Sequence, residues 1–322
     1  MVKDWSQQQA EQSLTLRAAW LHYVGGLTQA AVAKKLGVPQ VKAHRMIARA
    51  VADGAVRVTI DGDIVECIEL SERLCDKFVL DFCDVAPDLG EDGLPLRTLA
   101  RTAAARLQRW MQGGEVDTIG VGHGRTLAAT ARELPRFQAK GIRFVSLMGE
   151  LTRSYAANPH TVMHLLAERT AAQAYVFPVP LYANSAEDRN VLLAQRGVRE
   201  VYAMARAAPL KVLGIGTVHP DNHLVQAGMI SPDEVAEISR AGGVGELLGH
   251  FFNAEGEILE IPLSDRTLSV NVDDTRSDRI AAVAGGDEKI EALRAVLRSG
   301  RLSGLVTDER SARHLLDEVK HG

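Results

Sequence analysis

The side chains best suited to bind another molecule lie near the amino terminus, on a segment that we predict to be helical. Arginine can bond guanine through two hydrogen bonds, glutamine can pair with adenine, and lysine and arginine neutralise phosphates. At the start of the preceding helix, Thr28 and Gln29 could hydrogen-bond backbone phosphate. The exposed side chains that we predict to read DNA are Gln40, Lys42, His44, Arg45 and Arg49.

The charge of the chain is unevenly distributed. Residues 14–58 contain seven basic residues and one acidic residue, which is a net charge of +6. The whole chain of 322 residues has a formal charge of −4, so the remainder carries −10. A basic head on an acidic body indicates an anionic partner for the head alone.

The spacing of small residues predicts the element that would hold these side chains, a helix-turn-helix. If Gln29 is its first position, Ala33 is the fifth, where the two helices cross closely, and Gly37 is the ninth. The turn at that ninth position favours a left-handed backbone, which glycine adopts without penalty. A surface helical hairpin with a solvated basic face is the alternative. The shared core would consist of Val32, Leu36, Val38, Ala43, Met46 and Ile47.

The helices expected around this motif cover residues 29–36 and, from Pro39, continue to about Ala52. A helix over 14–24 precedes them. Its buried side is predicted to include Leu14, Ala18 and Leu21, with Trp20 and Val24 as further candidates. We expect residues 1–13 to form a loosely ordered arm. Residues 56–62 are predicted to form a β-hairpin.

The second group of chemically interesting residues follows a predicted strand over 118–122. A glycine-rich turn there leads into a helix, and its four candidate ligand contacts are Gly122, Gly124, Arg125 and Thr126. Glycines let the backbone approach a ligand, and a helix amino terminus offers free N–H groups to an anion or a hydroxyl cluster. The pattern is not a dinucleotide fingerprint, because no acidic residue follows at the expected place. A tight connection without a ligand is the alternative.

Three other loops follow strands and carry polar residues. One is Gly214–Thr217, and another is the Gly285–Lys289 segment, where Lys289 could pair with a phosphate or hydroxyl or could simply be solvated. In the third, Asn158 and His160 could bond polyol hydroxyls or cap the next helix. Ligands of α/β sheets bind beyond the carboxyl ends of the strands, where all these loops lie.

From about residue 84 apolar β runs alternate with helical stretches. This alternation predicts a mostly parallel sheet covered by helices, an α/β fold. We therefore divide the chain into a DNA-binding domain over 1–62, a connecting helix over 63–84, and an effector-binding and oligomerisation domain over 85–322. The strand and helix pairs are 118–122 with 126–133, 144–147 with 160–170, 174–179 with 186–195, and 211–215 with 232–240.

Composition excludes several other classes of protein. Hydrophobic residues make up 46% and charged residues 24% of the chain, which is ordinary for a globular protein. No apolar run is long enough for a membrane span, and the polar amino terminus lacks a signal peptide core. Cys67, Cys75 and Cys83 have neither metal-ligand nor paired disulfide spacing, so we expect buried or half-buried thiols in a reducing cytoplasm. We predict no metal and no cofactor.

Several segments, taken together and in this order, resemble the SorC family of sugar-responsive regulators. They are residues 27–50, IGVGHGRTL, GIGTV, GGVGELLGHFFNAEGE and the run from Ile280 to Leu316. The resemblance implies a winged helix-turn-helix joined to an effector domain like that of sugar-phosphate isomerases. It also implies assembly as a homodimer or homotetramer. The effector contacts that it implies are Gly124, Arg125, Thr126, Gly149, Asn158, Glu246 and Lys289.

Two positions depart from the family pattern. Met148 stands where family members that sense phosphorylated sugars often carry a basic residue, and Glu246 stands where aspartate is common. The loss of a phosphate-type contact favours an uncharged polyol, while Arg125 and Lys289 still permit a phosphate. We favour erythritol or a related polyol as the effector, with its phosphate second.

Three classes of function compete for this sequence. A sugar-phosphate isomerase would need a positioned general base, and His123 and Glu246 form no recognisable acid–base arrangement. An architectural DNA-binding protein would not require so large an α/β domain. We therefore predict a transcriptional regulator that acts as a repressor and binds double-stranded operator DNA. Binding of the effector would control it by shifting the populations of two conformations.

Overall fold

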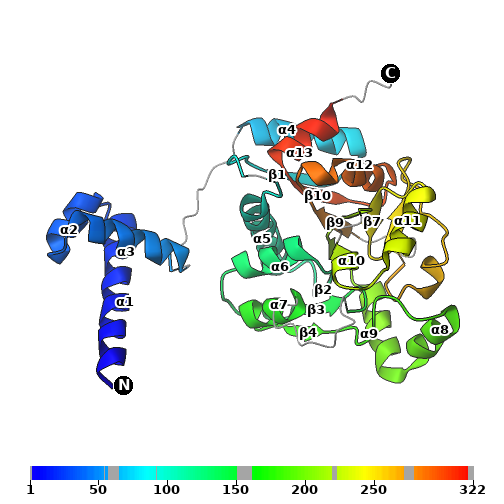
Figure 1. The fold of residues 1–322 in the computed structure, drawn as a ribbon, viewed down its shortest axis with the longest axis horizontal. Helices are drawn as coiled ribbons and strands as arrows, with labels where there is room; N and C mark the ends of the chain where they lie inside the picture. Colours follow the sequence, from blue (N-terminus) through cyan, green and yellow to red (C-terminus); the bar gives the residue numbers. More distant parts are fainter. Residues whose placement is uncertain are drawn as a thin grey trace. The chain divides into compact units, whose positions relative to one another are not determined.

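The computed structural model describes residues 2–53, 55–56, 65–91, 93–150, 162–219, 223–271 and 279–317. The chain divides into two compact units, Met1–Gly62 and Asp63–Gly322 (Figure 1). Each unit has its own core, and each is described by itself.

The described residues of the first unit form the helices α1 (Val2–Tyr23), α2 (Gln29–Leu36) and α3 (Gln40–Ala52). Its core confirms the six apolar positions predicted for the helix-turn-helix, with Leu36 and Val38 partly buried and the other four buried. From α1, Ala18 and Leu21 complete this core, and Leu14 packs against it. The helices therefore hold together through small apolar contacts that leave most polar side chains outside.

Two expectations about α1 are wrong. Trp20 and Val24 are exposed, because a period of 3.6 residues places them away from the face that contains Ala18 and Leu21. The helix begins at Val2, so residues 2–13 are not a loose arm. That stretch has no glycine or proline and is rich in glutamine, a residue that favours helices. Most of the predicted hairpin, residues 57–62, lies outside the described residues.

The second unit contains a seven-stranded sheet in the order β1-β10-β9-β5-β2-β3-β4, with every neighbouring pair parallel. This confirms the predicted α/β fold. Parallel strands joined by helices need cover on both faces, which accounts for their nearly continuous apolar runs. The strands are β1 (Phe82–Ala86), β2 (Thr118–Val121), β3 (Arg143–Ser146), β4 (Gln173–Tyr175), β5 (Leu210–Leu213), β9 (Arg279–Val283) and β10 (Gly304–Asp308).

Alternate residues of the strands enter two different cores. Ile119 of β2 and Phe144 of β3 join one cluster, whereas the next residue of β3, Val145, joins the other. A strand points successive side chains to opposite faces, so the two clusters lie on the two sides of the sheet. On one side the helices are α5 (Leu96–Gln112), α6 (Arg125–Glu133) and α7 (Val162–Thr170); on the other they include α4 (Val65–Phe78), α9 (Arg196–Ala207), α12 (Ile290–Arg298) and α13 (Glu309–Leu316).

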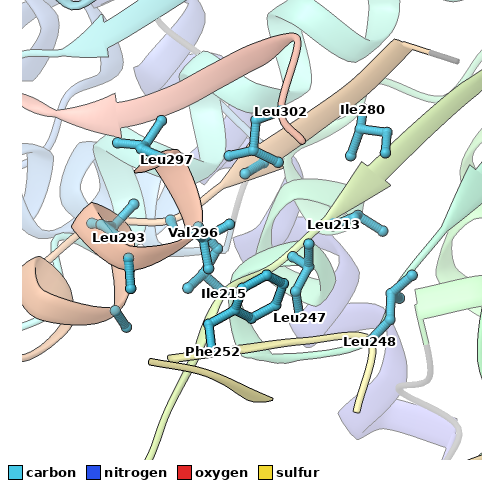
Figure 2. Packing of buried hydrophobic residues seen from close by; sticks show 14 of the residues in the cluster. Leu213, Ile215, Leu247, Leu248, Phe252, Ile280, Leu293, Val296, Leu297 and Leu302 are labelled. Atoms are coloured by element: carbon cyan, nitrogen blue, oxygen red, sulfur yellow. The ribbon is translucent and has the colours of Figure 1, made fainter. Parts of the chain in front are cut away.

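A small antiparallel sheet, which the sequence did not predict, packs beside the main one. Its strands are β6 (Gly216–Thr217), β7 (Gly245–Leu247) and β8 (His250–Phe252). Strands of two or three residues are too short to show a period in sequence. Figure 2 shows Leu247 and Phe252 of this sheet packed with Ile215 and with Val296 of α12, all buried. The remaining helices are α8 (Ala186–Ala194), α10 (His223–Gln226) and α11 (Pro232–Arg240), with short 3₁₀ turns η1 (Ser264–Arg266) and η3 (Asp287–Lys289).

The helix α4 packs within the second unit. Its Leu70 and Leu74 are buried there, and Lys77 Nζ donates to the carbonyl oxygens of Leu315 and Leu316 at 3.1 and 3.2 Å. These carbonyls end α13, where a cation is favourable. Among the described residues, none of the helices is long and apolar enough to cross a membrane.

The cysteines confirm the expectation of buried or half-buried thiols. Cys67 and Cys83 are buried and Cys75 is partly exposed, and none of them is in a disulfide. Burial raises the pKa of Cys67 to about 11 and also raises the pKa of Cys83. These side chains are therefore neutral thiols that pack as small apolar groups.

Candidate functional site

The turn between α2 and α3 has the geometry that the small-residue spacing predicts. Thr28 caps α2, its Oγ1 accepting the Ala31 N–H at 3.3 Å. Gly37 ends the helix with φ 66° and ψ 33°, in the left-handed region. Ala33 is 5% exposed and lies in the shared core. The turn is thus set by one cap, one small residue and one glycine.

The outer face of α3 is open to solvent and basic. Gln40, Lys42, Arg45 and Arg49 are all exposed there, the last 3.5 Å from the Asp53 carboxylate. Exposed ion pairs of this kind are weak and are readily exchanged for a phosphate.

Two of the predicted DNA contacts, from different helices, are in contact with each other. The Gln29 amide oxygen lies 3.0 Å from His44 Nδ1, which ties the start of α2 to the exposed side of α3. All seven residues predicted to contact DNA are therefore on α2, α3 or the cap of α2. On the exposed side of α3 these polar residues surround Val41, whose apolar side chain is 70% exposed.

A cavity of about 550 Å³ lies at the carboxyl ends of the parallel strands in the second unit. The turn after β2, the loop after β5 and the segment after β9 meet there, and the β7–β8 hairpin closes one side. This is the edge of an α/β sheet where ligands bind. The lining includes these residues that the sequence singled out: Gly122, Gly124, Arg125, Thr126, Glu246 and Lys289.

The glycine turn brings backbone and a helix end to the cavity. Gly124 is the amino cap of α6 with φ 128°, a conformation that L side chains rarely adopt. Arg125 is the first residue of α6 and its side chain is exposed, while Thr126 is buried. The free N–H groups of this helix end and the guanidinium make this wall of the cavity electropositive.

Glu246 places a carboxylate in the opposite wall. Its Oε1 accepts the Gly249 N–H at 2.5 Å, and Gly249 is half of a two-residue turn with Leu248 in which both φ angles are positive. Burial raises the pKa of Glu246 to about 6, against the lowering effects of the Gly249 hydrogen bond and the Lys289 charge. A carboxylate that is poorly solvated gains most from hydroxyl donors.

Close approach of the backbone explains a glycine beside this carboxylate. A Cβ built on Gly216 would lie 2.2 Å from Glu246 Oε2. Gly216 and Glu246 are paired residues of β6 and β7, so the absent side chain leaves room for the acid. The sequence identified Gly214–Thr217 as a loop of interest but did not indicate this contact.

Lys289 supplies a half-buried cation to the cavity lining. Its Nζ donates to the carbonyl oxygen of Ile215 at 2.6 Å, which joins the segment after β9 to the loop after β5. Burial lowers the pKa of Lys289, and the nearby Arg125 charge lowers it further, while Glu246 raises it. Lys289 is therefore close enough to Arg125 and to Glu246 to be influenced by both charges.

His123 is oriented by a hydrogen bond that gives it no catalytic arrangement. The buried Ser146 hydroxyl donates to the Met148 carbonyl at 2.8 Å, so its oxygen accepts from His123 Nε2 at 3.0 Å. The Ser146 hydroxyl proton is donated to a backbone carbonyl, so the imidazole does not activate that hydroxyl. A nucleophile with an adjacent base would require the reverse direction of donation.

One implied effector contact is not in the lining of the cavity. Gly149 is not in its lining, because Gly149 serves a packing role: its N–H donates to Leu268 at 2.8 Å, and a Cβ there would lie 2.4 Å from the Pro180 oxygen. The ligand contact at Gly149 therefore stays a prediction. Asn158 and His160 lie outside the described residues. Met148 does line the cavity.

Sequence reasoning missed several residues of the lining. His219 comes from the loop after β5, and Leu248 from the β7–β8 turn. Glu288 and Glu291 flank Lys289. Glu288 and Glu291 could have been found in the sequence because they lie beside Lys289. Leu248 could not, because it has φ 53°, a conformation that is unusual for leucine and that its sequence does not predict.

The chain matches known proteins along most of its length. Residues 62–317 match the family described as "Putative sugar-binding domain". The chain is 58% identical over 309 residues to the erythritol catabolism regulatory protein EryD of Brucella abortus, covering 96% of this chain and 98% of that protein. It is 33% identical over 312 residues to the transcriptional regulator LsrR of an Enterobacter species, covering 95% and 93%.

A solved structure has the same fold. The full-length sorbitol operon regulator SorC of Klebsiella pneumoniae superposes with a TM-score of 0.71 at 23% identity, covering 96% of this chain and all of that one. These relatives and this neighbour are regulators of transcription rather than enzymes.

Proposed function

The chain belongs to the SorC family of sugar-binding transcriptional regulators, and from that premise we propose that it represses a polyol catabolic operon until erythritol binds. Transcriptional regulation of sugar or polyol catabolism is the function of the family. Our proposal adds the effector, erythritol, and the direction of control, repression that the effector relieves. The 58% identity to a regulator of erythritol catabolism supports erythritol over other polyols.

The observation that carries the effector proposal is that Glu246, Arg125 and Lys289 line one cavity, with Lys289 near both of the other charged groups. A polyol offers several adjacent hydroxyls, each of which can donate to the carboxylate and accept from a cation or a helix N–H. A phosphate on the ligand would add negative charge beside the acid, and Met148 offers it no countercharge. An uncharged polyol therefore fits this set of groups better, with its phosphate as the second candidate.

The DNA-binding part of the proposal assigns distinct roles to the exposed face of the first unit. Thr28 and Gln29 contact phosphate, and the side chains of α3 read bases in the major groove. One three-helix head binds weakly, so the working species is a homodimer or homotetramer on paired half-sites. The α3 residues assigned to DNA are Gln40, Lys42, His44, Arg45 and Arg49.

The control mechanism is a shift between two conformational populations. Lys289 is bonded to the carbonyl oxygen of Ile215, which joins the loops after β5 and β9. A ligand hydroxyl that accepts from Lys289 competes with this bond and favours another arrangement of the two loops. We propose that this change is passed to the subunit contacts and alters the spacing of paired heads.

Operator affinity with and without ligand tests the proposal directly. Because the operator sequence is not known, the duplex is one selected by the full chain from a random DNA library. We expect erythritol to weaken binding to it by about 10-fold or more in a mobility-shift titration, within the usual range of coupling between sites. Erythritol phosphate should act less strongly.

A control variant separates the two halves of the proposal. Arg45→Ala should lose operator affinity yet keep the rise in melting temperature that erythritol produces, since a ligand that binds only the folded state stabilises it. If neither erythritol nor erythritol phosphate changes the melting temperature, erythritol is not the effector. If Arg45→Ala binds the duplex like the parent chain, α3 is not the recognition helix.

A further inference from the structure

A buried carboxylate lies behind the effector cavity, at the end of β10. Asp308 is the last residue of this strand and the amino cap of α13, and it is only 1% exposed. It is not among the described residues that line the cavity. Burying a carboxylate is unfavourable unless its oxygens accept hydrogen bonds, so the donors around Asp308 identify the part of the chain that it holds in place.

Both oxygens of Asp308 accept hydrogen bonds, and the second reaches beyond its own helix. Oδ1 accepts the Ser311 N–H at 3.0 Å, which is an ordinary amino cap. Oδ2 accepts the Gly286 N–H at 2.8 Å and the Ser311 hydroxyl at 2.6 Å. The Gly286 N–H also lies 2.9 Å from Ser311 Oγ, so the two side chains share one backbone donor. Asp308 and Ser311 therefore hold the segment that follows the neighbouring strand β9.

The glycine pair of this segment makes room for the carboxylate. A Cβ built on Gly285 would lie 2.1 Å from Asp308 Oδ2, so the acid occupies the space that a side chain would take. Gly286 has φ 94°, a conformation that L side chains rarely adopt, and it directly precedes the η3 turn. Its N–H points to Asp308 and Ser311, while its carbonyl accepts the Lys289 N–H at 2.9 Å. Gly286 thus connects the buried acid to the backbone of Lys289.

We propose that Asp308 is a positioning residue of the effector site, which fixes the turn from which Lys289 reaches the cavity. Lys289 Nζ donates to the Ile215 carbonyl at 2.6 Å, a bond that requires the two backbones to be held at a set distance. The lysine side chain is flexible, so a fixed backbone beneath it reduces the entropy that a ligand must overcome on binding. The inference rests on the proposed function only in taking this cavity as the place where the effector binds.

The alternative is that Asp308 acts only as the cap of α13. A cap requires one acceptor for the Ser311 N–H, and a serine in this place would supply it. That role accounts neither for the bond from Oδ2 to Gly286 nor for the space that Gly285 leaves. A substitution that keeps the cap and removes Oδ2 therefore separates the two roles.

Chemical labelling of Lys289 in the full chain tests the proposal without any ligand. In Asp308→Ser the amine should react several-fold faster with acetic anhydride than in the parent chain, because the turn that holds Lys289 against Ile215 is released. Ser311→Ala keeps the backbone cap and favours the helix, and it should act in the same direction. Peptide mass spectrometry measures the rates, with the exposed Lys140 as the internal reference.

Ser185→Ala is the matched control for the loss of a helix cap. Ser185 caps α8 by accepting the Asp188 N–H at 3.1 Å and is not part of the described cavity lining. This variant should leave the labelling rate of Lys289 unchanged, and an equal rise in it would overturn the proposal. An unchanged rate in Asp308→Ser would overturn it too, or in Ser311→Ala if Asp308→Ser does not fold.

Calorimetric titration with erythritol gives the readout that is tied to the proposed function. Asp308→Ser should bind about 10-fold more weakly than the parent chain, as for the loss of one charged hydrogen bond, and Ser185→Ala should bind as the parent does. Gly285→Ala should weaken binding in the parent chain, where its methyl group meets the carboxylate. It should add little in Asp308→Ser, where that oxygen is gone, so additive losses would contradict the contact.

Failure of this inference differs from failure of the proposed function. If the parent chain binds no erythritol while labelling of Lys289 still accelerates in Asp308→Ser, the choice of effector is wrong and the positioning role stands. If erythritol binds the parent chain and Asp308→Ser with equal affinity, Asp308 is only a cap and the inference is wrong.

Discussion

Glu246 is the residue whose environment says most about the proposed effector. It is an acid in a cavity wall, bonded to a backbone N–H of its own turn and near the charge of Lys289. Burial raises its pKa from 4.5 to about 6, so the surroundings of this side chain disfavour the charged form. Hydroxyl donors from a polyol would favour the charged form and offset that cost.

This raised pKa predicts a pH-dependent penalty on stability. Between pH 4.5 and 6 the folded chain holds the Glu246 proton more tightly than the unfolded chain does, so the free energy of unfolding falls as pH rises through this window. The full loss, on the order of 2 kcal/mol, applies above about pH 6. Glu246→Gln should remove the penalty, unfold at a higher temperature at pH 7.5 and lose affinity for erythritol.

Thermal unfolding at several pH values measures this difference. Glu291→Gln is the matched control, since Glu291 also lines the cavity but is exposed to solvent. If Glu246→Gln follows the parent curve at pH 7.5, the acid is solvated and its role in the cavity is wrong.

The glycine beside Glu246 gives a second prediction at the scale of a single residue. Gly216→Ala would put a methyl group 2.2 Å from Glu246 Oε2, and the carboxylate would have to leave its place against Gly249. We expect erythritol affinity to fall by about 10-fold or more, as for the loss of one charged hydrogen bond. Gly214→Ala, whose Cβ would meet its nearest atom at 3.6 Å, should bind nearly as the parent chain does. Calorimetric titration compares them, and equal affinities would contradict the assigned contact.

At the scale of elements, the α2–α3 turn depends on the conformation of one residue. Gly37 has φ 66°, and no atom lies within 4 Å of a Cβ built on it. A substitution there therefore costs conformational energy alone. Gly37→Ala should destabilise the head by about 1 kcal/mol, and Gly37→Asn by less, because asparagine tolerates the left-handed region.

Thermal unfolding and operator titration of the two variants check this expectation. A loss of operator affinity in Gly37→Ala that Gly37→Asn partly restores would attribute the loss to the turn. Equal behaviour of alanine and asparagine would show that the left-handed conformation is not what the turn requires.

At the scale of the whole molecule, the separation of charge determines how salt acts on DNA binding. The +6 segment over residues 14–58 lies on a chain of net charge −4, so long-range attraction comes from the head. We expect the affinity to fall steeply between 50 and 200 mM salt, because each neutralised phosphate releases counterions. Lys42→Ala should reduce the logarithmic salt slope by about one per head.

Titrations at several salt concentrations supply that slope. Lys140→Ala, which removes an exposed lysine from the second unit, should leave it unchanged. An unchanged slope for Lys42→Ala would mean that Lys42 does not neutralise a phosphate.

The sequence by itself determined the features that depend on neighbours in the chain. The Gln29, Ala33 and Gly37 spacing predicted the turn, because a helix-turn-helix is limited by local crossing and backbone conformation. Alternating β and helical patterns predicted the parallel sheet, because each pattern is set by residues close together in the chain. Only the tertiary structure decided which distant loops meet: Arg125, Glu246 and Lys289 converge because β2, β5 and β9 end at one edge and a short antiparallel hairpin closes it. It also decided that Gly149 is a packing glycine, since this depends on contacts across the fold that sequence spacing does not contain.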